Sequence, residues 1–198
     1  MEKDNISVAM QQLIDAVRQI FETEASKDTA GSPALQRILA LLPELRLDPE
    51  PPEPSPQSVC RHFERALDLG EAGPAGAAAA AIRELAPTLS WVQNPNYTVK
   101  NKGAEFMDNY AWSGLGLTGS TALCFGIMLL GPGITYPMTA YPPEGVFLVI
   151  GGSPEWKCGD GPWARVEAGR VIYRPANGAE GKKPGNEPML ALFAWLYE

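Results

Sequence analysis

Two tyrosines in the C-terminal half of the chain are the first residues whose type and spacing suggest acid–base chemistry. Tyr136 and Tyr141 lie in the stretch GITYPMTAYPPEGVFLVIGG, which runs from Gly133 to Gly152. An unperturbed tyrosine titrates at a pKa of about 10, so it needs a nearby cation or metal to act as a base at neutral pH. The alternative role for either residue is that of an aromatic side chain that packs and forms hydrogen bonds.

A tight transition-metal site is not expected, because the chain is poor in the ligands that such ions prefer. Stable sites need several converging nitrogen, sulfur or oxygen ligands, commonly from histidine. His62 is the single histidine, and the surrounding pattern places it in a helix in the other half of the chain, half-exposed. The other candidate ligands near the tyrosines are Glu144, Cys158, Asp160 and Glu180. We therefore predict no bound metal and no other cofactor.

The tryptophans suggest a second kind of site. Indole rings can enclose a sulfonium or ammonium group through cation–π contact. Aromatic residues on strands belong more often to the core, so both interpretations stay open. The residues concerned are Trp112, Trp156, Trp163 and Trp195.

The elements that must position these side chains differ between the two halves of the chain. From Ile6 to Phe21 apolar residues recur at three-to-four spacing, which predicts a helix of roughly four turns. Further helices are predicted after Pro33, after the Pro/Glu-rich segment 48–56, and in the alanine-rich stretch AGAAAAAIREL. We therefore predict a helical region over residues 1–88.

From about Ser90 onward the sequence changes to short β-prone runs separated by Gly, Pro and Asn. Runs such as AEFMDNYAW, TALCFGIMLL and PMLALFAWLY predict a sandwich or barrel of about seven or more strands. We expect this barrel over residues 89–198, with the helical bundle packed on it, because both parts have apolar faces to bury. The predicted fold class is therefore mainly β with an N-terminal α-helical bundle.

Charge and composition restrict the partners of the chain. The formal net charge is −7, from 16 basic and 23 acidic residues, and Lys and Arg do not cluster. This balance argues against binding to nucleic acid or to anionic membrane surfaces. No apolar run approaches the roughly 20 residues of a membrane-spanning helix, and the N-terminus lacks a signal pattern. Cys60, Cys124 and Cys158 form an odd, widely spaced set, which favours free buried thiols in a reducing cytoplasm.

The spacing of glycines in the C-terminal half resembles the first motif of cupin barrels. That motif has a glycine, a His-x-His pair, a glutamate and a second glycine at set intervals. Gly133 and Gly152 stand at the two glycine positions of the motif. Thr139 and Tyr141 stand in place of the histidines, and Gly145 stands in place of the glutamate. The glycine spacing of the motif is therefore present, but other residues stand at its metal-ligand positions.

The second cupin motif shows the same combination of frame and substitution. It has a glycine, then Pro-x-Gly, then a histidine. Gly169 and Pro175 occupy the first two positions, Asn177 replaces the glycine, and Glu180 stands in place of the histidine. The resemblance implies a jelly-roll barrel from which the usual metal ligands are absent.

A narrower resemblance is to the cupin-type dimethylsulfoniopropionate (DMSP) lyases of bacteria. It covers most of the chain: a helical N-terminal half of similar length, then FMDNYAW, GPGITYP and finally EPMLALFAWL. In that family a divalent metal holds the substrate carboxylate, and a tyrosine removes the proton alpha to it. Dimethyl sulfide then leaves and acrylate remains. The resemblance implies that Tyr136 corresponds to a tyrosine that the family has in its YP-x-H-x-H stretch. It also implies that Phe147 replaces a metal-binding tyrosine.

The resemblance also places Glu180 facing the barrel interior, where partial desolvation suits proton transfer. Pairing with Lys182 or Lys183 on a surface turn is the alternative. The candidate catalytic residues are therefore Tyr136, Tyr141 and Glu180, and the candidate substrate-binding residues are Thr139, Phe147, Trp156 and Trp195.

Three functions are compatible with these features. The first, which we favour, is a metal-independent lyase or isomerase that abstracts a proton from a small carboxylate or onium substrate. The second is a non-catalytic cupin that binds a small metabolite as a sensor or carrier. The third is an assembly role, in which barrel edges form a homodimer, as cupins often do. Fold resemblance alone does not separate them.

Overall fold

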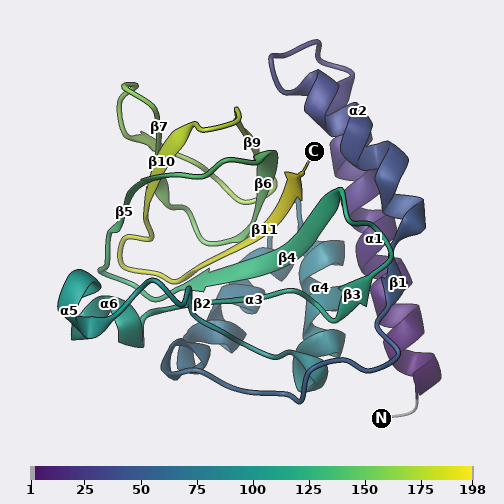
Figure 1. Cartoon of the computed structure of the whole chain (residues 1–198), viewed down its shortest axis with the longest axis horizontal. Coiled ribbons are helices and arrows are strands. Elements are labelled where there is room, and N and C mark those ends of the chain that lie inside the picture. The colour runs from purple at the N-terminus through teal and green to yellow at the C-terminus, as the bar shows by residue number, and fades with distance from the viewer. Residues whose placement is uncertain (1–2, 198) are drawn as a thin grey trace.

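The computed structural model describes residues 3–197, with side chains described from residue 5, and it has three stacked layers (Figure 1). A layer of helices covers one face of a five-stranded sheet. A four-stranded sheet packs against the other face, so that the two sheets enclose a second core. The fold is the cupin jelly-roll barrel with helices on its outside, as the sequence predicts.

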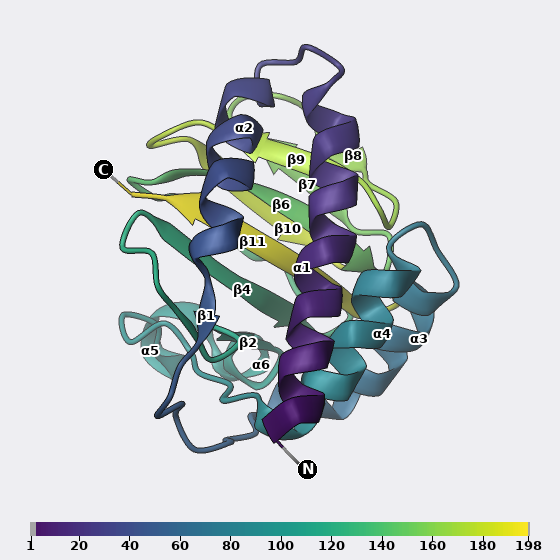
Figure 2. The same cartoon turned by 90° about the vertical axis from the view of Figure 1, so that its right-hand side faces the viewer.

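The helical layer comes from the N-terminal part of the chain. Its helices are α1 (Lys3–Ala25), α2 (Ser32–Leu41), α3 (Phe63–Glu71) and α4 (Gly76–Leu85). Figure 2 shows α1 and α2 lying across the five-stranded sheet, with α3 and α4 beside α1. Pro33 lies in the first turn of α2, where its missing N–H has no helical partner to lose.

The five-stranded sheet is antiparallel, with the strand order β2-β4-β11-β6-β9. Its strands are β2 (Tyr110–Ser113), β4 (Leu123–Leu130), β6 (Glu144–Gly151), β9 (Val171–Arg174) and β11 (Met189–Leu196).

Both faces of the central strands are apolar because both are covered. On β6, Val146, Leu148 and Ile150 face the helices, whereas Phe147 and Val149 face the barrel interior. Side chains of a strand alternate between its two faces, so a strand buried on both sides has an unbroken apolar sequence. This explains runs such as GVFLVIGG, in which apolar and polar residues do not alternate.

The four-stranded sheet has the order β5-β10-β7-β8 and is also antiparallel. Its strands are β5 (Tyr136–Ala140), β7 (Glu155–Cys158), β8 (Ala164–Arg165) and β10 (Ala179–Lys183). Because β10 lies between β5 and β7, side chains on its inner face have neighbours from both strands.

Two segments differ from the elements that the sequence predicts. Helix α6 (Ala104–Asp108) occupies the first part of the run AEFMDNYAW, which was expected to form a strand, and the short helix α5 (Val99–Lys102) precedes it. The Thr98 hydroxyl caps α5 by accepting the Asn101 N–H, which favours a helix start over a strand. In the N-terminal half, β1 (Arg46–Leu47) pairs with β3 (Leu117–Thr118), so that half is not purely helical.

The three cysteines are free, but Cys158 at the end of β7 is exposed, so the expectation of buried thiols is wrong for it. Cys60 and Cys124 are half-buried.

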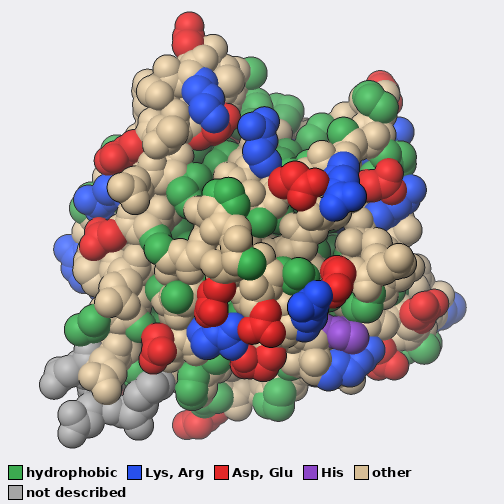
Figure 3. All heavy atoms as spheres, turned by 180° about the vertical axis from the view of Figure 1, so that it is seen from behind, with side chains coloured by type: hydrophobic (Ala, Val, Ile, Leu, Met, Phe, Trp, Pro, Cys, Tyr) green, Lys and Arg blue, Asp and Glu red, His purple; other side chains and the backbone are tan. Residues whose placement is uncertain are grey.

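The surface of the helical layer carries charges of both signs (Figure 3). Arg83 on α4 contacts Glu64, Asp68 and Glu71 on α3, which ties these two helices together. His62 is half-exposed just before α3, as the sequence predicts. Within residues 3–197, no helix has both the length and the apolar character needed to cross a bilayer.

Candidate active site

Three tyrosine hydroxyls form a closed triangle at the barrel interior. The hydroxyl of Tyr136 lies 2.6 Å from that of Tyr141 and 2.9 Å from that of Tyr97. The Tyr97 and Tyr141 hydroxyls lie 2.8 Å apart, which closes the triangle. Each phenol can donate one hydrogen bond and accept others, so the triangle satisfies all three hydroxyls.

The three tyrosines come from different elements. Tyr136 is the first residue of β5, Tyr141 follows the last residue of that strand, and Tyr97 lies just before α5. Rings of Phe106 on α6 and Tyr110 on β2 pack against Tyr136, with ring centroids 5.7 and 5.6 Å away. The Lys102 ammonium lies 4.3 Å from the centroid of the Tyr97 ring. The short helices α5 and α6 thus hold Tyr97 against the barrel.

Burial determines the protonation state of these phenols. Burial raises the pKa of both Tyr136 and Tyr141 above the ordinary value, and repulsion from neighbouring phenolates adds to this effect. Burial likewise raises the pKa of Tyr110. At neutral pH the phenols of Tyr110, Tyr136 and Tyr141 are therefore neutral.

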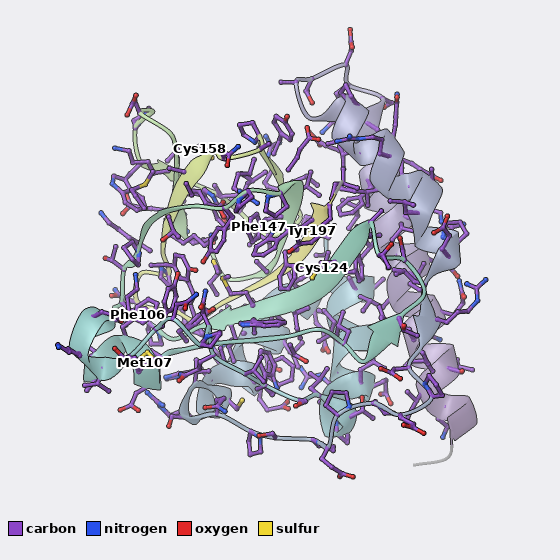
Figure 4. All side chains as sticks on the ribbon, viewed as in Figure 1. Phe106, Met107, Cys124, Phe147, Cys158 and Tyr197 are labelled. Carbon is purple, nitrogen blue, oxygen red and sulfur yellow. The ribbon has the colours of Figure 1, made fainter. Side chains whose placement is uncertain are left out.

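A cavity of about 290 Å³ lies beside the triangle and is largely aromatic. Its lining residues are Asn94, Pro95, Asn96, Tyr110, Trp112, Cys124, Met128, Tyr136, Tyr141, Phe193, Trp195 and Tyr197. Figure 4 shows two of them, Cys124 and Tyr197, toward the C-terminal end of β11, with Phe147 between the two sheets. A larger groove of about 1070 Å³ runs between α1 and α4, but it contains none of the predicted site residues. The aromatic cavity is the candidate active site.

Three charged side chains lie inside the barrel next to this cavity. Glu180, Lys182 and Arg174 are each at most 1% exposed. Lys182 Nζ is 2.9 Å from Glu180 Oε1, and Arg174 Nε is 3.8 Å from the same oxygen. The Trp156 indole N–H donates to Glu180 Oε2 at 3.1 Å. One carboxylate is therefore shared by two cations and one neutral donor. We call the three charged side chains, Glu180, Lys182 and Arg174, the Glu180 cluster.

The strand register explains how Lys182 is enclosed. Glu180 and Lys182 are two residues apart on β10, so both point inward. Lys182 is directly opposite Tyr136 on β5 and Trp156 on β7. Its ammonium lies 4.8 Å from the Tyr136 ring centroid, 4.5 Å from that of Trp156 and 4.4 Å from that of Phe147. Burial lowers the pKa of Lys182, while Glu180 acts in the opposite direction.

Arg174 links the Glu180 cluster to the tyrosine triangle. Its guanidinium donates to the carbonyl oxygens of Tyr141 at 2.8 Å and of Pro143 at 2.6 Å. The same group lies 5.6 Å from the Tyr141 ring centroid and 5.5 Å from that of Trp195. Arg174 therefore fixes the loop that carries Tyr141, and burial lowers its own pKa.

The structure brings together some of the predicted site residues and separates others. Tyr136, Tyr141 and Trp195 line the cavity. Phe147 and Trp156 instead surround the Lys182 ammonium.

Of the remaining two predicted residues, the Thr139 hydroxyl donates to the Pro137 carbonyl. Glu180 is buried and ion-paired, not on a surface turn, and neither residue is among those that line the cavity.

Sequence reasoning missed the contributions of Tyr97 and Arg174 and considered Lys182 only as a surface partner. For Lys182 the signal was available, because a lysine two positions after an inward-facing residue on a strand also faces inward. Tyr97 lies 39 residues before Tyr136, and no local pattern links the two.

The side chains at the cupin motif positions do not fit a transition metal. The Thr139 and Tyr141 hydroxyls already have partners, Gly145 has no side chain, and the Glu180 carboxylate is shared by two cations. An ammonium 2.9 Å from the single carboxylate at these positions would repel a divalent cation. Within the described part of the chain, no three His, Cys, Asp or Glu side chains converge.

The two-sheet barrel and its motif positions define the chain as a cupin. A family model described as dimethylsulfoniopropionate lyase matches residues 32–191, and the chain belongs to this family. The chain is 26% identical to the dimethylsulfoniopropionate lyase DddQ of Ruegeria pomeroyi over 172 residues, which cover 84% of the chain and 82% of that protein.

Solved structures agree in fold. The structure described as that of the DMSP lyases RdDddP and RnDddQII matches with a TM-score of 0.77 and 21% identity, covering 96% of this chain and 93% of the other. The crystal structure of DMSP lyase DddQ from Ruegeria pomeroyi matches with a TM-score of 0.65 and 20% identity, covering 95% and 92%. These matches include the helical layer as well as the barrel.

Proposed function

We propose that this DMSP-lyase-like cupin is a metal-independent lyase or isomerase that abstracts a proton from a small carboxylate or onium substrate in the aromatic cavity. The observation that carries the proposal is the triangle of tyrosine hydroxyls at the wall of that cavity. A proton-transfer group next to an enclosed, mostly apolar space is the arrangement that such chemistry needs. The poor fit of the motif positions to a metal supports the metal-independent form.

Tyr136 is the best placed of the three phenols to take the proton. When Tyr136 is ionised, its oxygen accepts hydrogen bonds from both Tyr97 and Tyr141, which stabilise the negative charge. Tyr97 and Tyr141 are less deeply buried and connect Tyr136 to the outside. They therefore supply the route by which its proton leaves before turnover and returns afterwards.

The reaction balances without a metal or a redox partner. The Tyr136 oxygen takes the proton alpha to the substrate carboxylate, and the C–H electron pair forms a carbon–carbon double bond. In a lyase, the group on the β-carbon leaves with its own bonding pair. In an isomerase, the double bond shifts and the proton returns to another carbon.

The Glu180 side chain contributes in a different way. We predicted it as a catalytic residue together with Tyr136, and that role stays a prediction. Its contacts to Lys182 and Trp156 favour a positioning role, because its carboxylate holds the ammonium inside the barrel.

Exchange of the substrate α-proton for deuterium tests the proposal without requiring the natural substrate. Purified protein in D₂O would be incubated with DMSP and with 3-butenoate, whose α-proton is also allylic, and followed by proton NMR. We expect exchange or product formation with at least one probe. Tyr136→Phe should lower that rate by about 100-fold or more, the usual contribution of a general base.

Tyr173→Phe is the matched control. It makes the same chemical change at a hydroxyl that donates to Glu144 and lies outside the cavity. Its rate should equal that of the unmodified protein. Equal rates for Tyr136→Phe and Tyr173→Phe would remove Tyr136 from the mechanism.

A non-catalytic cupin that binds a small metabolite is the second candidate. The raised pKa of the phenols favours it, since neutral phenols bind ligands well but abstract protons slowly. Ligand binding without exchange of α-protons at any pH up to the alkaline limit of stability would establish this alternative.

A further inference from the structure

The Glu180 cluster carries more positive than negative charge. Arg174 and Lys182 contribute two cations against the single carboxylate of Glu180, and all three are buried. Arginine keeps its proton in proteins. Burial lowers the pKa of Lys182, but the Glu180 carboxylate 2.9 Å away and three ring faces oppose this and favour the protonated lysine. The barrel interior therefore contains a positive centre that belongs to the chain itself.

Each of these cations contacts an aromatic ring that belongs to a cavity-lining residue. The Lys182 ammonium lies 4.8 Å from the ring centroid of Tyr136, which lines the cavity. The Arg174 guanidinium lies 5.6 Å from the Tyr141 ring centroid and 5.5 Å from that of Trp195, and these rings also line the cavity. In a site of low dielectric constant, a charge behind the wall of a cavity still acts on a ligand inside it.

A hydrogen-bond donor without an acceptor belongs to a residue of the cavity wall. The Trp195 indole nitrogen is buried and has no partner among the described residues. Its side chain lines the cavity wall beside Phe193 and Tyr141. A buried N–H without an acceptor is costly, and only a ligand oxygen that reached this atom would remove that cost.

We propose that the cavity is selective for small carboxylates over onium cations, with Lys182, held by Glu180, as a built-in cation in the region where the second cupin motif places a metal ligand. This rests on the proposed function only in that it takes the aromatic cavity as the ligand site. The carboxylate is attracted by Lys182 and Arg174, which contact rings of the cavity wall.

The aromatic wall does not reverse this preference. An aromatic ring attracts a cation through its negative face. For Tyr136, Tyr141 and Trp195, a cation of the protein already contacts the ring. A second cation on the cavity side would be repelled by the first across the ring. The cavity therefore resembles an onium cage in composition while its electrostatics favour the opposite charge.

Three probes of nearly equal shape test the selectivity. The first, 4-methylpentanoate, has a carboxylate and no cation; DMSP has the same shape with a sulfonium in place of the branching carbon. Dimethylpropylsulfonium has the cation and no carboxylate. Titration calorimetry should show that 4-methylpentanoate binds about tenfold or more tightly than DMSP. Dimethylpropylsulfonium should bind most weakly.

Substitution of the lysine identifies the source of the selectivity. Lys182→Met keeps the length of the side chain and removes its charge, and it should lower the affinity for 4-methylpentanoate by about tenfold. Lys183→Met is the matched control, because Lys183 is the next residue on β10 and its ammonium contacts Trp163 instead. The control should bind like the unmodified protein. Circular dichroism of both variants checks that they fold.

The probe series tests the selectivity for carboxylates even if Lys182→Met does not fold. Equal or tighter binding of DMSP or dimethylpropylsulfonium relative to 4-methylpentanoate would overturn the proposal, as would failure of all three to bind at millimolar concentration. The two proposals fail separately. Selective carboxylate binding without α-proton exchange refutes only the catalytic function, and exchange with tighter onium binding refutes only the selectivity.

Discussion

Glu180 and Lys182 lie two residues apart on one strand, and their pairing changes what the cupin frame can hold. A lone buried carboxylate or a lone buried ammonium would each be costly, and removing one partner of a buried pair is strongly destabilising. In this chain the two side chains lie 2.9 Å apart, with Arg174 at 3.8 Å from the same carboxylate oxygen. A glutamate at a ligand position has thus become the counter-ion of an internal cation.

The protonation of Tyr136 gives the proposed reaction a defined pH dependence. Burial raises its pKa above the ordinary value of about 10. Below the pKa of a general base, the active fraction grows about tenfold per pH unit. We therefore predict that the rate of α-proton exchange, measured by NMR in buffered D₂O, rises steadily from neutral pH to about pH 10 without a plateau.

The groups that face the Tyr136 phenol act in opposite directions on this profile. Phenols of Tyr97, Tyr110 and Tyr141 oppose ionisation by charge repulsion once they ionise themselves, whereas Lys182 behind the ring is a cation. A rate that levels off near neutral pH would assign the base to a group other than a buried tyrosine.

At the level of elements, the close packing of α3 on β6 depends on two glycines. A Cβ at Gly151 would lie 2.0 Å from the Ala66 carbonyl oxygen, and one at Gly70 would lie 2.8 Å from the Ile150 carbonyl oxygen. The backbone of the helix therefore contacts the backbone of the strand directly, which fixes the height of the helical layer above the sheet.

We predict that Gly151→Ala lowers the free energy of unfolding by about 1–3 kcal/mol, the usual cost of overpacking. Thermal unfolding followed by circular dichroism measures this change. The folded fraction should still bind cavity ligands, because Gly151 does not line the cavity. Gly114→Ala is the control, since a Cβ at Gly114 meets no atom within 4 Å. Equal melting temperatures for the two variants would show that the helix can move away at no cost.

The elements could be predicted where local pattern decides them. The three-to-four spacing from Ile6 to Phe21 corresponds to α1, and the apolar run at Gly145–Ile150 corresponds to β6. The start of the β-prone run AEFMDNYAW forms α6 instead of a strand, because the break at Gly103, with a φ of 87°, starts a new helix directly after α5.

The site was predictable only in part, for a related reason. Tyr136 and Tyr141 follow from the motif, since both lie within five residues on or beside one strand. Tyr97 and Arg174 reach the site through tertiary packing, from a loop before α5 and from the end of β9. No sequence period connects such segments, so the triangle and the Glu180 cluster appear only in the folded chain.

For the whole molecule, the five-stranded sheet belongs to two cores at once. On β11, Leu190, Leu192 and Ala194 pack toward the helices, whereas Ala191 and Phe193 pack toward the barrel interior. Neither the helical layer nor the barrel can lose its partner without exposing one face of this sheet. The helical region and the barrel are therefore expected to depend on each other for stability.

This shared sheet leads to a prediction about unfolding. The helical circular dichroism signal comes mainly from α1 to α4, whereas most tryptophans lie in the barrel half. In urea, the two signals should change in one coincident transition. Leu13→Ala, at a fully buried position of α1, should shift both signals together by about 2–5 kcal/mol.

Val8→Ala is the control for this substitution, because Val8 lies on the same helix and is 56% exposed. It should leave both transitions where they are in the unmodified protein. If Leu13→Ala shifted the helical signal and left the tryptophan signal unchanged, the helical layer would be an independent unit. The barrel, with its tyrosine triangle and internal cation, would then be stable without it, and ligand binding should survive in urea after the helices have unfolded.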